Sequence, residues 1–171
     1  MNPATLLAKA FTAGATDLQR RAPLLDQINV FPVVDGDTGV NMSQTIAVGA
    51  SYLETRSEDD LATLCNRLCQ PLLRGARGNS GVIFSQFLIG FLGALGRESR
   101  LSRHSFSAAV ARGRDAAYAS VGKPVEGTIL TVMSDMRDII EDIGEIDSLD
   151  AHRRLEQRLS EAVVRTPEIM P

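Results

Sequence analysis

The sequence has little of several features that would direct it to a particular class of protein. Its only two cysteines, Cys65 and Cys69, lie one helical turn apart, so no disulfide framework is implied. The net charge is -3 and the basic residues are dispersed, so nothing favours a nucleic-acid partner. The longest apolar run, 82–95, is broken by serine, glutamine and glycines and is too short and polar for a membrane span. The N-terminus lacks a basic-then-apolar signal pattern, and we expect a cytoplasmic protein.

The composition is that of one soluble globular domain. The 171 residues, 44% of them hydrophobic and 23% charged, are enough to bury a core. No segment alternates apolar and polar residues with a period of two, so we expect no sheet. Segment 78–95 is apolar on nearly all sides, which is typical of a helix buried at the centre. These features predict an all-α fold, an antiparallel bundle of about seven helices over residues 1–171.

Apolar residues at helical spacing mark the expected helices. Asn2 and Pro3 are typical of a cap and first turn, and the helix that they open is expected to give way to a short turn over 22–28. The pattern Ser57-x-x-Asp60 is a capping box before a stripe that places both cysteines in the core. Further helices are expected after Gly39 and over 78–95, 106–121, 129–143 and 155–163.

The acidic stretch 29–42 carries the clearest chemistry. Asp35 and Asp37 flank Gly36, so a turn can direct both carboxylates at one point. Magnesium takes oxygen ligands and usually bridges phosphates through one or two carboxylates, so this pair suits a phosphate-bound metal. The alternative is a surface turn whose acidic residues only cap the next helix. The stretch by itself favours neither interpretation.

Two further loops could complete a nucleotide site. Gly75, Gly78 and Gly81 precede a long helix, where glycine backbone and free helix amides can approach phosphate. Their spacing alone is explained better by a tight turn between helices. The loop from Gly122 to Thr128 is the least specific, and Thr128 is expected to cap the next helix. Neither loop matches the P-loop or the dinucleotide fingerprint.

Together the three loops resemble the nucleotide-binding domain of bacterial fatty acid kinase. The resemblance rests on residues 29–42, on Ala-Arg-Gly-Asn-Ser-Gly-Val-Ile at 76–83 and on Pro-Val-Glu-Gly-Thr-Ile-Leu at 124–130. That domain is similar to the nucleotide-binding L subunit of dihydroxyacetone kinase. The resemblance implies an up-and-down helical barrel of about eight helices, which holds ATP and two magnesium ions at one rim.

The resemblance also implies a role for individual residues. Asp35 and Asp37 correspond to the metal-binding carboxylates at the catalytic centre. The dihydroxyacetone kinase pattern has a third, upstream aspartate, whose nearest match here is Asn29, with Asp26 as the weaker match. The implied nucleotide-binding residues are Thr38, Gly39, Asn41, Met42, Gly78, Asn79, Ser80 and Gly81, with Gly122, Thr128 and Leu130 towards the nucleoside.

The activity implied is transfer of the γ-phosphoryl group of ATP to a fatty acid carboxylate, which a separate fatty-acid-binding protein presents. An ionised carboxylate needs no general base, which agrees with the lack of an obvious one. One alternative is phosphorylation of dihydroxyacetone on a partner subunit, against which Thr38 weighs because that relative has histidine there. Another is a non-catalytic helical interaction module, against which the intact Asp35 and Asp37 weigh.

The C-terminal residues 166–171 contain two prolines, which usually lead out of a helix. The family that the chain resembles continues beyond this point with a segment that helps to close the nucleotide site. We therefore expect a chain truncated at its C-terminus. The further partners considered are C-terminal domains of the same chain and a second copy in a homodimer.

Overall fold

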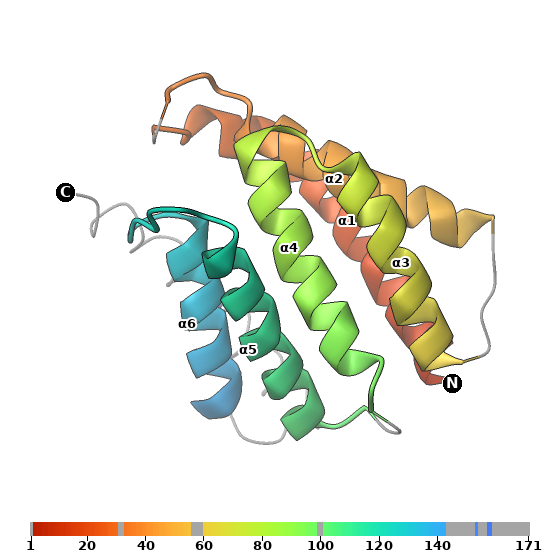
Figure 1. The fold of residues 1–171 in the computed structure, drawn as a ribbon. Coiled ribbons are helices and arrows are strands. Elements are labelled where there is room, and N and C mark those ends of the chain that lie inside the picture. Colours follow the sequence, from red (N-terminus) through yellow and green to blue (C-terminus); the bar gives the residue numbers. More distant parts are fainter. Residues whose placement is uncertain are drawn as a thin grey trace.

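A computed structural model of the chain describes residues 2–30, 33–55, 60–98, 101–142, 153 and 157–158. Within these residues the fold is all-helical, which confirms the predicted class (Figure 1). The helices are α1 (Pro3–Gln27), α2 (Thr38–Glu54), α3 (Leu61–Gly75), α4 (Gly78–Leu95), α5 (Arg103–Ala119) and α6 (Ile129–Asp142). The helix predicted over 155–163 lies almost wholly outside the described residues.

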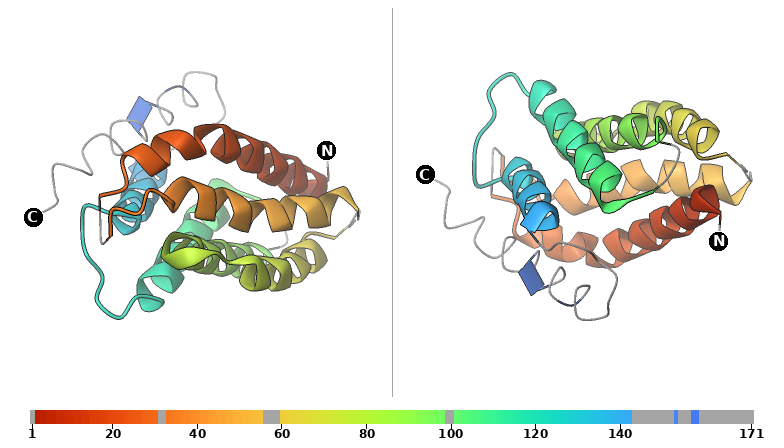
Figure 2. Two further views of the ribbon diagram at one scale, coloured as in Figure 1. Left: turned by 90° about the horizontal axis from the view of Figure 1, so that it is seen from above. Right: turned by 90° about the horizontal axis from the view of Figure 1, so that it is seen from below.

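Helix α4 is the centre of the bundle, as its apolar sequence predicts. It packs against α3 on one side and α5 on the other, and also against α2 (Figure 2). Leu92 is fully buried and Leu95 is 1% exposed, and both belong to the hydrophobic core. With a mean hydropathy of 1.4, α4 is the one described helix long and apolar enough to cross a bilayer. Three neighbouring helices contact α4, and 39% of the span is buried, with Val82 exposed.

Both cysteines lie where their apolar stripe predicts. Cys65 is fully buried in α3 and Cys69 is half-buried one turn later, with its thiol donating to the Cys65 carbonyl oxygen at 3.2 Å. Burial raises the pKa of the Cys65 thiol to about 12, with smaller contributions from Cys69 and Asp60. Both thiols are free and serve as core residues.

Helix α1 does not end at the turn predicted over 22–28 but continues to Gln27 and includes Pro23. Proline removes one backbone donor, which favours an earlier end by local criteria. Ala22 is buried against the start of α2, and a Cβ on Gly39 would lie 2.1 Å from the Ala22 carbonyl oxygen. This close packing between α1 and α2 stabilises the last turn of α1 in spite of the proline.

The cap of α3 also differs from the prediction. Asp60 occupies the N-cap position, and its carboxylate accepts a hydrogen bond from the Thr63 amide at 2.7 Å. The side-chain and backbone hydrogen bonds from Thr63 lower the pKa of Asp60. The predicted capping box places the cap three residues too early, and Ser57 itself lies outside the described residues.

Candidate nucleotide-binding site

The three loops singled out from the sequence lie at one end of the bundle (Figure 1). They connect α1 to α2, α3 to α4, and α5 to α6. The helices that follow the first two loops are joined directly, because the Ser80 hydroxyl at the start of α4 donates to the Thr38 carbonyl oxygen at the start of α2, at 3.4 Å. The starts of α2 and α4 therefore lie side by side, and both present the positive end of a helix dipole.

The acidic loop is organised by a hydrogen bond within itself. The Asn29 side-chain amide donates to Asp35 Oδ1 at 2.8 Å, while Asp35 and Asp37 are both exposed. Gly36 between them has a φ of 65°, a left-handed conformation that glycine adopts without strain. Asn29 is only 9% exposed, and its Oδ1 has no hydrogen-bond partner among the described residues. An unpaired buried oxygen is costly, so this atom is available to a water molecule or a ligand.

The cap of α2 bears on the alternative that the acidic residues only cap the next helix. Asp37 occupies the N-cap position, but its side chain makes no capping hydrogen bond. Asp26 of α1 performs this task instead, accepting from the Gly39 amide at 2.6 Å and the Val40 amide at 3.2 Å. Capping therefore does not account for the exposed Asp37 carboxylate.

The glycines at the start of α4 allow that helix to approach α2 closely. Gly78 has a φ of 57°, and a Cβ there would lie 2.3 Å from Asn41 Nδ2. A Cβ on Gly81 would lie 2.4 Å from Thr45 Oγ1. The same Thr45 hydroxyl accepts from the Arg77 amide at 3.1 Å and donates to the Asn41 carbonyl oxygen at 2.7 Å. Helix packing thus explains both glycines, and it also brings two helix N-termini together.

The structure places the predicted phosphate-binding residues in two environments. Asn79 is exposed and Thr38, Asn41 and Ser80 are half-buried at the joined starts of α2 and α4. By contrast, Gly39 and Met42 are buried, and the Gly39 amide already donates to Asp26. Nucleotide contacts of all these residues stay predictions.

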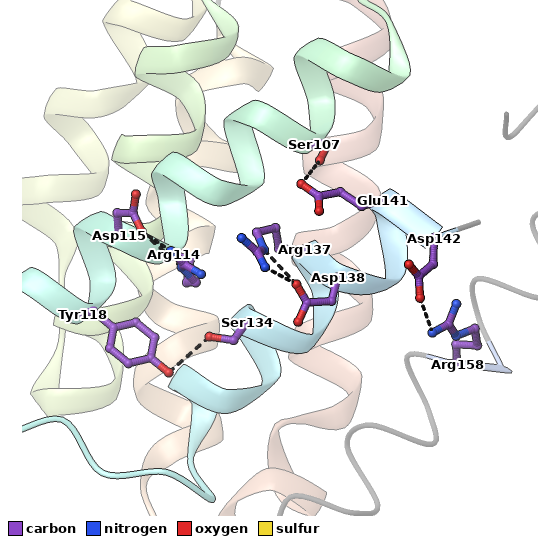
Figure 3. A network of polar contacts seen from close by, with 10 residues as sticks. All are labelled: Ser107, Arg114, Asp115, Tyr118, Ser134, Arg137, Asp138, Glu141, Asp142 and Arg158. Carbon is purple, nitrogen blue, oxygen red and sulfur yellow. Dashed lines mark hydrogen bonds and ion pairs between the residues drawn. The ribbon is translucent and has the colours of Figure 1, made fainter. Parts of the chain in front are cut away.

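The third loop contains a residue that sequence reasoning did not single out as a site residue, Glu126. The Tyr118 hydroxyl donates to Glu126 Oε1 at 3.0 Å, and the Thr131 hydroxyl donates to Glu126 Oε2. The Gly127 amide donates to Thr131 Oγ1 at 2.8 Å, and Tyr118 also contacts Ser134 (Figure 3). Burial is the main cause of the raised pKa of Tyr118. Glu126 therefore holds the loop between α5 and α6.

The residues predicted to approach the nucleoside differ in their surroundings. Thr128 caps α6 as predicted, with its hydroxyl oxygen accepting from the Leu130 amide at 3.3 Å. Leu130 itself is 2% exposed and belongs to the core. Gly122 lies in open surroundings, since a Cβ there would have no heavy atom within 4 Å. Leu130 is therefore closed to a ligand, whereas Gly122 is exposed and Thr128 is half-buried.

Comparison with known protein families identifies the family to which the chain belongs. Residues 32–171 match the model of the DAK2 domain family. The chain belongs to this family. The DAK2 domain is related to the L subunit of dihydroxyacetone kinase, so the kinase superfamily that the three loops resemble is confirmed. Asp26 and Asn29 precede the matched residues, whereas Asp35, Asp37 and the other predicted site residues lie within them.

Curated relatives extend the similarity across α1. Protein YloV of Bacillus subtilis (strain 168) is 40% identical over 166 residues, which cover 96% of this chain and 30% of YloV. An uncharacterized protein of Staphylococcus epidermidis (strain ATCC 12228) is 39% identical over 167 residues, with the same two shares. One from Staphylococcus aureus (strain USA300) is 42% identical over 130 residues, 76% of this chain and 24% of that protein. This DAK2 domain thus spans less than a third of these relatives.

The donor atoms at the acidic loop fit a magnesium ion that also binds phosphate. No group of three or more His, Cys, Asp or Glu side chains in the described part of the chain forms a metal cluster. The loop offers two exposed carboxylates, Asp35 and Asp37, and the unpaired amide oxygen of Asn29. Magnesium favours such hard oxygen donors and takes few from the protein when phosphates supply others.

Proposed function

We propose that this DAK2 domain binds ATP with magnesium where α2 and α4 begin, and donates the γ-phosphoryl group to a fatty acid carboxylate. The observation that carries the proposal is the unpaired, buried Oδ1 of Asn29. The other end of the same amide holds Asp35, so a buried acceptor and an exposed carboxylate lie side by side. This pairing supports a cation at the loop, and the adjoining N-terminus of α4 favours the phosphates.

The chain's own residues would have two roles, which are to bind the magnesium ions and to position the phosphates. Asp35, Asp37 and Asn29 would hold two magnesium ions, and the Ser80 hydroxyl with the first amides of α4 would contact phosphate. Bound magnesium supplies neutralisation of the triphosphate charge. Since the acceptor carboxylate is already ionised, no residue needs to remove a proton from it. The chain's contribution is therefore positioning and electrostatics.

The acceptor is proposed to arrive on a fatty-acid-binding partner that covers the acidic loop. Transfer requires the acceptor oxygen within about 3–3.5 Å of the phosphorus, so its carrier must contact this end of the bundle. Four large apolar side chains around the loop are strongly exposed: Val34 at 75%, Val33 at 60%, Val30 at 54% and Ile28 at 51%. Such a concentration of exposed aliphatic side chains is typical of a protein-binding surface.

Calorimetric titration of ATP, with and without magnesium, tests the nucleotide site. Wild type is expected to bind only with magnesium, and the double variant Asp35→Asn/Asp37→Asn is expected to lose binding. Glu98→Gln is the control, because Glu98 is an exposed acid just beyond the far end of α4. Unchanged binding by the double variant would remove the acidic loop from the site. If wild type does not bind, the titration is repeated on a longer chain that includes the C-terminal segment, and no binding there would favour a non-catalytic interaction module.

A second assay separates the two acceptor classes. Family membership makes dihydroxyacetone on a partner subunit the alternative acceptor. Each acceptor is supplied with its binding protein, and acyl phosphate and dihydroxyacetone phosphate are measured. Turnover of dihydroxyacetone without acyl phosphate would overturn the fatty acid proposal and leave the nucleotide site intact.

A further inference from the structure

Asp26 lies in the last helical turn of α1, yet its carboxylate forms hydrogen bonds with the first turn of α2. Its Oδ1 accepts both the Gly39 amide, at 2.6 Å, and the Val40 amide, at 3.2 Å. These bonds span 13 and 14 residues of sequence. The first amides of a helix have no partner inside it, and a negative charge is favourable there. Asp26 therefore caps α2 from another helix.

The contact is reinforced by packing on both sides of the bond. Gly39 is buried, and a Cβ on it would lie 2.1 Å from the carbonyl oxygen of Ala22, one turn before Asp26. The backbone of α1 and the start of α2 consequently touch without a side chain between them. The acidic loop leaves α1 and enters α2 at this junction, so its two ends are held together at its base.

We infer that Asp26 is a positioning residue for the acidic loop and not a metal ligand. Asp26 connects the two ends of the loop by accepting from Gly39. Within the loop, Asn29 connects two segments by donating to Asp35. With both connections present, Asp35 and Asp37 are held ready for a cation. The ligand in this inference rests on the proposed function, whereas the role of Asp26 in holding the loop does not.

The arrangement also restricts where phosphate binds. The Gly39 and Val40 amides already donate to a carboxylate of the protein, which fills the anion position at the start of α2. A phosphate group would therefore use the start of α4, where Ser80 is half-buried, rather than the Gly39 amide. This differs from the assignment of Gly39 that the family resemblance implies.

Two substitutions in the full chain separate positioning from metal ligation. Asp26→Asn keeps an acceptor oxygen for the two amides but removes the charge, whereas Asp26→Ala removes both. Hydrogen exchange of the Gly39 and Val40 amides is measured in the absence of nucleotide, together with thermal unfolding. Magnesium affinity is then measured by titration in the presence of ATP. Glu98→Gln again serves as the charge-matched control.

A positioning residue predicts that Asp26→Ala accelerates exchange at both amides and weakens magnesium binding by about 10- to 100-fold, as loss of an outer-shell partner does. Asp26→Asn is expected to retain slow exchange and most of the affinity. If Asp26→Asn weakens magnesium binding as much as Asp26→Ala while exchange stays slow, Asp26 is a ligand and the inference is wrong. Unchanged exchange in Asp26→Ala would also overturn it. If neither this chain nor a longer one with the C-terminal segment binds magnesium nucleotide, the proposed function fails, and the exchange measurements still decide the role of Asp26.

Discussion

Asn29 donates its side-chain amide to Asp35 at 2.8 Å, while its own buried carbonyl oxygen has no hydrogen-bond partner in the described part of the chain. A single side chain thus orients one exposed carboxylate and presents a second oxygen beside it. In a protein interior such an oxygen is normally satisfied, so a bound cation is its natural complement. This relationship is the starting point for the first prediction.

Asn29→Asp is expected to make the thermal stability of the domain depend on magnesium. The substitution replaces the donor to Asp35 by a second carboxylate, and two like charges this close repel each other. Without metal the melting temperature should fall by a few degrees, and magnesium should restore it because the cation neutralises the pair. Thermal unfolding with and without magnesium measures this, with calcium-free buffer and Glu98→Gln as controls. A melting temperature that magnesium leaves unchanged would remove the cation from this position.

Gly81→Ala is expected to destabilise the domain and weaken nucleotide binding. Its Cβ would lie 2.4 Å from Thr45 Oγ1, so either the Thr45 hydroxyl must leave its two hydrogen bonds or α4 must move away from α2. Such overpacking costs about 1–3 kcal/mol. Gly93→Ala is the matched control in the same helix, because its Cβ would meet nothing within 4 Å and alanine should stabilise α4 by about 0.5–1 kcal/mol. Denaturant unfolding measures the free energy of unfolding of both variants. An equal change in the two variants would contradict the packing argument.

Stability is expected to fall in alkaline solution partly because of Cys65. Burial raises the pKa of this thiol from 9.0 to about 12, so the folded state keeps a proton that the unfolded state loses. The stabilising contribution of the protonated Cys65 thiol to folding is therefore fully present below pH 9 and is lost as the pH rises towards 12. Cys65→Ala should be less stable at neutral pH but should lose less stability over this range. Denaturant unfolding at a series of pH values measures both curves, and parallel curves would contradict the assignment.

Val34→Asp is expected to impair phosphoryl transfer to the partner-bound acceptor without impairing ATP binding. Val34 is 75% exposed beside the acidic loop, so a charge there would be buried unpaired when a partner covers the loop. Leu6→Asp is the control, because Leu6 is 49% exposed near the start of α1, at the opposite end of that helix. Acyl phosphate formation against partner concentration measures the effect. An equal loss in both variants would show that the loop is not the docking surface.

The sequence by itself determined the fold class and most helix positions. The expected bounds of α4 agree with the structure, and Asn2 and Thr128 cap α1 and α6 as predicted. These features depend on residues within one or two turns of each other, and apolar periodicity and capping report such local interactions directly. Asp35 and Asp37 could be singled out for the same reason, since their chemistry lies in adjacent residues of one turn.

Only the tertiary structure decided how the loops are held. The last turn of α1 persists beyond Pro23 because Gly39 of α2 packs against Ala22. Asp26 caps α2 through the Gly39 amide, 13 residues away, and the unpaired oxygen of Asn29 appears only once its surroundings are in place. These interactions join residues that are distant in the chain or buried by other helices. The local sequence pattern does not predict such contacts, because their free energy depends on the packing of whole helices.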